Sequence, residues 1–134
     1  MKSFFCFSLI CGLFLSNTTC VHAQSTEDIH AKAIRLALEA GGLNTTGHPS
    51  ASKDYGPFLI KAGFDTVSMV NYKPTPGDIR VIQPYPNGEV SGFIDMFDGQ
   101  IWVSEYKEDG FWPTPQYEKY KPKYQIFRWA KKSR

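Results

Sequence analysis

All three cysteines of the chain lie within its first 20 residues, and this placement limits the folds that remain open to it. They accompany an apolar run, Phe4 to Leu15, that follows a positive charge at Lys2. Such a run is typical of a signal peptide and is too short to span a bilayer, which needs about 20 residues. The side chains of Val21 and Ala23 favour cleavage after Ala23.

Cleavage there would divide the chain into a signal peptide, residues 1–23, and one domain, residues 24–134. Removing 23 of the 134 residues leaves 111 residues without a cysteine. The stability of this domain must then come from its hydrophobic core, because no disulfide can form. We predict export to a bacterial periplasm; a retained membrane anchor and a lipid anchor on Cys20 are the weaker interpretations, since the apolar run is short and a proper lipobox is missing.

Apolar periodicity predicts a strong helix over Ile29–Ala40, capped near Ser25 or Thr26 and ended by Gly41-Gly42. The expected buried face of this helix consists of Ile29, Ala33, Leu36, Ala37 and Ala40. A second, short helix is predicted over Tyr55–Ala62.

From Thr66 onwards apolar residues tend to recur at every second position, which is the period of a β-strand. The predicted strands cover residues 66–70, 78–83, 90–97, 100–106 and 124–129, with turn residues between them. Residues 111–122 are rich in proline and aromatic side chains and carry no clear period. Helices followed by an antiparallel meander indicate an α+β domain.

Several short motifs follow one another along the chain in a distinctive order. They are Ala37-Leu38-Glu39-Ala40-Gly41-Gly42, Gly47-His48-Pro49, Lys53-Asp54-Tyr55-Gly56, Gly77-Asp78-Ile79, Trp102-Val103-Ser104 and Phe111-Trp112-Pro113. Their joint order resembles the CHAP/NlpC-type papain-like peptidoglycan amidases, to which type VI secretion amidase effectors are related. The resemblance implies a papain-like α+β fold, in which N-terminal helices pack on a small antiparallel sheet.

The resemblance also implies where the catalytic groups of an active relative would lie. Such enzymes use a thiolate at the start of the first helix, a histidine on a strand and a polar or acidic group on the next strand. This chain has His30 at the nucleophile position, Phe93 at the base position and Glu105 at the third position. Cysteine-peptidase chemistry cannot run without sulfur, and the chain has no cysteine after Cys20. We therefore predict a pseudoenzyme.

A pseudoenzyme would act by binding. We interpret the chain as an immunity protein or inhibitor of a related peptidoglycan amidase toxin. One alternative is a peptidoglycan-binding module that retains the former substrate cleft. The other is a hydrolase with catalysis rebuilt around His30 and Glu105. A pair of carboxylates, Asp95 and Glu105, could act as in a glycosidase, but nothing in the sequence supports the separation that such a pair needs.

Binding is expected to involve Phe93, Glu105, Trp112, Lys119, Lys121, Lys123 and Arg128. The last four belong to an aromatic and basic C-terminal region, residues 118–134, that suits an acidic partner or an anionic cell wall. An edge strand with solubilising charge is the simpler explanation of this region. No metal or cofactor is expected, because His30 has only His48 as a histidine companion in the mature chain and zinc prefers clustered ligands. Export and a formal net charge of +2 argue against nucleic acid.

Overall fold

The computed structural model describes residues 26–105, 107 and 110–130. The predicted signal peptide and the basic C-terminal residues Lys131, Lys132 and Arg134 lie outside the described residues, as does Ser25. Within the described part of the chain, no helix combines the length and apolar character needed to cross a membrane.

The secondary structure follows the predicted succession of helices and then strands, with one additional helix. In order, the elements are α2 (Ile29–Ala40), the 3-10 helix η1 (Ser52–Asp54), α3 (Tyr55–Ala62), β1 (Phe64–Val67), β2 (Ile79–Ile82), β3 (Phe93–Phe97), β4 (Trp102–Val103), α4 (Pro115–Tyr120) and β5 (Tyr124–Trp129). Helices α2 and α3 and strand β5 have the predicted bounds. Strand β1 begins earlier than predicted and β2 to β4 are shorter, because the alternation of side chains does not reveal where pairing stops.

The five strands form one antiparallel sheet in the order β1-β5-β2-β3-β4. Phe127 of β5 lies opposite Thr66 of β1 on one side and Ile79 of β2 on the other. The prediction of a simple meander was therefore wrong, and so was the interpretation of the last strand as an edge strand. The inner position of β5 buries Ile126 and Phe127, which explains why this apolar strand inserts there.

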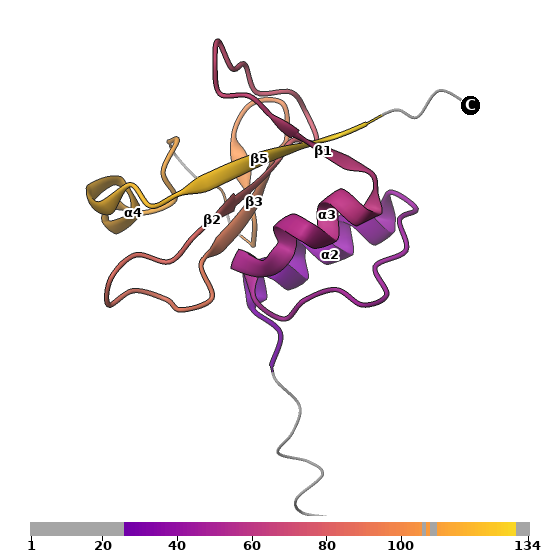
Figure 1. Ribbon diagram of the computed structural model, residues 1–134, viewed down its shortest axis with the longest axis horizontal. Coiled ribbons are helices and arrows are strands. Elements are labelled where there is room, and N and C mark those ends of the chain that lie inside the picture. The colour runs from indigo at the N-terminus through magenta and orange to yellow at the C-terminus, as the bar shows by residue number, and fades with distance from the viewer. Residues whose placement is uncertain (1–25, 106, 108–109, 131–134) are drawn as a thin grey trace, which may run out of the picture.

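Helices α2 and α3 lie next to each other and pack on the sheet, α2 against β3 and α3 against β1 and β5 (Figure 1). The main core lies between them and the sheet. Its α2 residues are Ala31, Ile34 and Leu38, whereas Ile29 and Leu36 are 55% and 48% exposed. The predicted buried face of α2 was wrong, because two stripes of the helix satisfy the same apolar spacing and only the sheet selects between them.

Helix α4 falls inside the segment that was expected to be irregular. Thr114 caps it by accepting a hydrogen bond from the Tyr117 amide, and Pro115 occupies its first turn. Tyr117 joins Ile82 and Phe93 in a second buried cluster. Because side chains alternate along β2, Ile82 points away from the main core, so β2 is buried on both faces.

Candidate functional site

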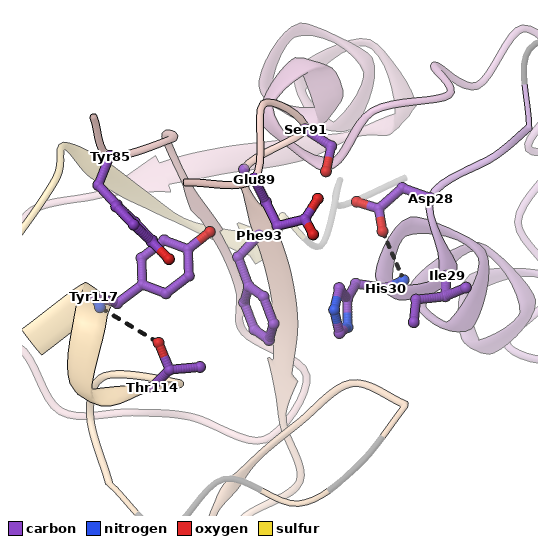
Figure 2. A pocket seen from close by; sticks show the side chains of 10 residues that line it. Asp28, Ile29, His30, Tyr85, Glu89, Ser91, Phe93, Thr114 and Tyr117 are labelled. Carbon is purple, nitrogen blue, oxygen red and sulfur yellow. Dashed lines mark hydrogen bonds between the residues drawn. The ribbon is translucent and has the colours of Figure 1, made fainter. Parts of the chain in front are cut away.

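A pocket of about 350 Å³ opens at the start of α2. Its lining comes from the first residues of α2, from the loop between β2 and β3, and from Thr114 and Tyr117 of α4 and its cap (Figure 2). Gly92 of that loop has a φ of +70°, and a Cβ atom there would lie 2.5 Å from the Ile82 carbonyl oxygen. The wall of the pocket therefore requires glycine at this position.

His30 and Phe93, which were predicted to stand at the nucleophile and base positions, face each other in this pocket. Their ring centroids are 4.4 Å apart with an interplanar angle of 46°. Phe93 is 3% exposed and also packs against Tyr117, with ring centroids 5.8 Å apart. Phe93 thus forms part of the pocket wall, and open space remains beside it.

The first turn of α2 is fixed by Asp28. Its Oδ1 accepts a hydrogen bond of 3.1 Å from the His30 amide, and its Oδ2 accepts one from the buried Ser52 hydroxyl. Asp28 is therefore the helix cap, and the prediction of Ser25 or Thr26 was wrong. Asp28 lies directly before the helix, and the hydrogen bond from Ser52 of η1 holds its carboxylate in place. This cap places His30 at the second residue of the helix.

The imidazole of His30 is in a partly buried, acidic environment. Burial lowers the pKa of His30, and the negative charges of Asp28, Glu105 and Glu89 oppose that shift only in part. At neutral pH the ring is therefore uncharged. Its Nδ1 lies 3.2 Å from the Ser104 hydroxyl, which belongs to the turn after β4.

Glu105, the third predicted position, is exposed and affects His30 by its charge. The neighbouring Ser104 contacts the imidazole, although Ser104 is not among the described residues that line the pocket. Of the three predicted positions, the structure brings His30 and Phe93 to the pocket and leaves Glu105 outside its described lining. Sequence reasoning included Ser104 in a motif but gave it no role, because a single serine has no spacing that predicts which side chain it contacts.

The other predicted binding residues lie apart from the pocket, on α4, β5 and the segments beside them. Trp112 is half-buried, with its ring against Phe111 and Tyr124 in T-shaped contacts, and belongs to the second cluster. The three predicted lysines are exposed, namely Lys119, Lys121 and Lys123. They remain available to solvent or a partner.

Arg128 forms an ion pair with Asp78. Its Nε and one terminal nitrogen donate to the two carboxylate oxygens of the buried Asp78, each at 2.8 Å. Burial raises the pKa of Asp78, but hydrogen bonds from Arg128 and Tyr72 outweigh it and the net pKa lies below the ordinary value. The role of Arg128 in this structure is to fasten β5 to the turn before β2.

A second ion pair, Arg80 with Asp95, is fully buried between β2 and β3. The two residues are register partners, and Arg80 Nε lies 3.0 Å from Asp95 Oδ1. The guanidinium carbon lies 4.4 Å from the Trp102 ring centroid and 4.8 Å from that of Phe111. Asp95 therefore cannot serve as a cleft carboxylate facing Glu105. The described residues also contain no group of three or more side chains suited to hold a metal ion.

The sequence matches no family model and no curated protein. A matching solved chain comes from the crystal structure of the type VI native effector–immunity complex Tae3–Tai3 from Ralstonia pickettii. It is 35% identical, with 79% of this chain and 88% of that chain covered and a TM-score of 0.67. The selenomethionine form of the same complex gives 34% identity, coverages of 79% and 92%, and a TM-score of 0.64.

Proposed function

This chain belongs to the family of the matched chain in the Tae3–Tai3 type VI effector–immunity complex, and from this premise we propose that it is a non-catalytic immunity protein. It would bind and inhibit a peptidoglycan amidase effector. The fold would be a degenerate form of the CHAP/NlpC amidase domain, with the chemistry lost and the surface kept for binding.

The contact between His30 and Phe93 carries this proposal. The resemblance to the amidases assigns both residues to positions of a catalytic pair, and their rings are 4.4 Å apart at the pocket. A phenyl ring accepts no proton, and an imidazole at a helix start is no substitute for a thiolate. Removal of members of such a catalytic unit costs several orders of magnitude in rate.

An effector–immunity pair consists of a toxic and a protective member. Absence of cysteine after residue 20 favours the protective role for this chain, since an amidase of the resembled class attacks with sulfur. The proposed signal peptide favours the same role. Peptidoglycan is degraded in the periplasm, so a protein that neutralises an amidase must be exported there.

The direct test is inhibition of an amidase effector encoded beside this chain. The protein, secreted and purified from a periplasm, is mixed with the effector, and the release of muropeptides from sacculi is measured. We expect stoichiometric inhibition and a stable complex on gel filtration. The immunity proposal would be contradicted if the protein neither bound nor inhibited this effector.

The open pocket favours a second candidate, a peptidoglycan-binding module. Its volume of about 350 Å³ lies within the range of small-molecule sites, about 300–1,000 Å³. Incubation of the protein alone with sacculi separates the possibilities. Sedimentation with sacculi and no hydrolysis supports the binding module, whereas muropeptides that disappear in a His30→Ala variant support the rebuilt hydrolase around His30 and Glu105.

A further inference from the structure

The pocket carries a chemical preference that neither an amidase mechanism nor an immunity role requires. Two of the residues that line it are carboxylates, Asp28 and Glu89, and none of its described lining residues is a lysine or an arginine. His30 is the histidine of the described lining, and burial lowers its pKa, which disfavours the charged ring. The described lining therefore presents two carboxyl groups and no lysine or arginine.

The opposite wall of the pocket is aromatic. Figure 2 shows the rings of Tyr85, Tyr117 and Phe93 on one side and Asp28 with His30 on the other, with the Glu89 carboxylate reaching in between them. Tyr85 and Tyr117 make a T-shaped contact with centroids 4.9 Å apart, which fixes their orientation. Aromatic faces attract cations, and guanidinium groups in particular stack on them.

One apolar residue of the lining is open to solvent. Ile29, which lines the pocket, is 55% exposed. Arginine and lysine side chains have a long apolar stem below their charge. Such a stem matches the exposed side chain of Ile29 beside an acidic and aromatic interior.

We propose that this pocket binds the side chain of an arginine or lysine presented on a peptide segment. The charged group lies beside the carboxylates of Asp28 and Glu89 and faces the aromatic wall, and the stem passes Ile29 at the opening. This inference goes beyond the proposed function, because the pocket can be tested with peptides in the absence of any effector.

The test is a titration of the secreted protein, labelled with ¹⁵N, with blocked tripeptides observed by NMR. The central residue of the peptide is arginine, lysine or citrulline, the uncharged isostere of arginine. We expect the arginine and lysine peptides to shift amide resonances of the pocket lining, above all those of Ser91 and Gly92. The citrulline peptide is expected to bind about tenfold more weakly than the arginine peptide.

The matched variants are Glu89→Gln and Glu118→Gln, which remove one exposed carboxylate each, at the pocket and on α4 respectively. Glu89→Gln should weaken the arginine peptide about fivefold and leave the citrulline peptide unchanged, while Glu118→Gln should change neither. Equal binding of arginine and citrulline peptides, equal effects of the two variants, or no binding at millimolar peptide would overturn the inference. The result of this titration does not decide whether the protein inhibits an effector, because no effector is present in it.

Discussion

His30 occupies a position where its charge state is set by competing forces. Burial favours the neutral ring, while Asp28, Glu89 and Glu105 attract a proton and Ser104 contacts Nδ1. The net effect is a pKa below the ordinary value of about 6.5. Between these two pKa values the unfolded chain binds more protons than the folded protein, so the stability contributed by neutral His30 is present above about pH 6.5 and declines as the pH falls.

We therefore expect the free energy of unfolding to fall between about pH 7.5 and pH 5.5 more steeply in the wild type than in a His30→Gln variant. Urea denaturation at several pH values measures both slopes. Gln116→Asn, at an exposed position of α4, is the control: it removes no histidine and should keep the wild-type slope. A His30→Gln variant with the wild-type slope would contradict this account of His30.

Sequence reasoning could identify His30 and Phe93 as a pair but not their surroundings. The motif order placed both at aligned positions, and the structure brings them into contact. The cap at Asp28 and the contact with Ser104 depend on η1 and β4, which lie far along the chain from α2. Single polar residues such as these give no periodic signal, so only the fold reveals their contacts.

At the scale of elements, local sequence signals predicted whether a segment forms a helix or a strand, but not its position in the sheet. Helices α2 and α3 end at glycines, and β5 lies between a proline-rich stretch that ends at Pro122 and the basic C-terminal residues, so their bounds could be predicted. The insertion of β5 between β1 and β2 could not, because every apolar strand of the chain offers the same pairing groups. The Thr114-Pro115 start of α4 was a usable signal that aromatic and proline content obscured.

The pair Arg80 and Asp95 joins β2 to β3 inside the protein, and its disruption should be costly. An Asp95→Asn variant leaves a buried guanidinium without its counter-charge, and we expect the free energy of unfolding to fall by about 3 kcal/mol. Chemical denaturation measures this loss. Asp65→Asn on the exposed position of β1 is the control and should cost less than about 0.5 kcal/mol.

The same pair need not be a net source of stability. Burial raises the pKa of Asp95 to about 6 despite the opposing charge of Arg80, which indicates a large desolvation cost. The combined replacement of Arg80→Met and Asp95→Leu should therefore recover most of the loss, to within about 1 kcal/mol of the wild type. A double variant as unstable as Asp95→Asn would show that the ion pair itself, rather than the unpaired charge, decides the stability.

At the scale of the whole molecule, the sheet and α2 bring two positions that are distant in the sequence together at the pocket. β3 presents Phe93, and the capped start of α2 presents His30, at the second residue of the helix. A thiol there would gain from the positive end of the helix dipole, and a histidine on β3 would lie within reach of it. The proposed descent from an amidase therefore predicts that the framework for the chemistry is retained although the reacting groups are gone.

Restoring both groups tests that view of the fold. We expect the His30→Cys variant to react with iodoacetamide at a lower pH than a Leu36→Cys variant, whose thiol lies on an exposed, mid-helix position. The combined His30→Cys and Phe93→His variant should release muropeptides from sacculi, whereas either single substitution should not, because a thiolate and a base act as one unit. Identical alkylation profiles for the two thiols would mean that position 30 lacks the environment of a nucleophile, and the resemblance to an amidase would then extend to the order of motifs but not to the site.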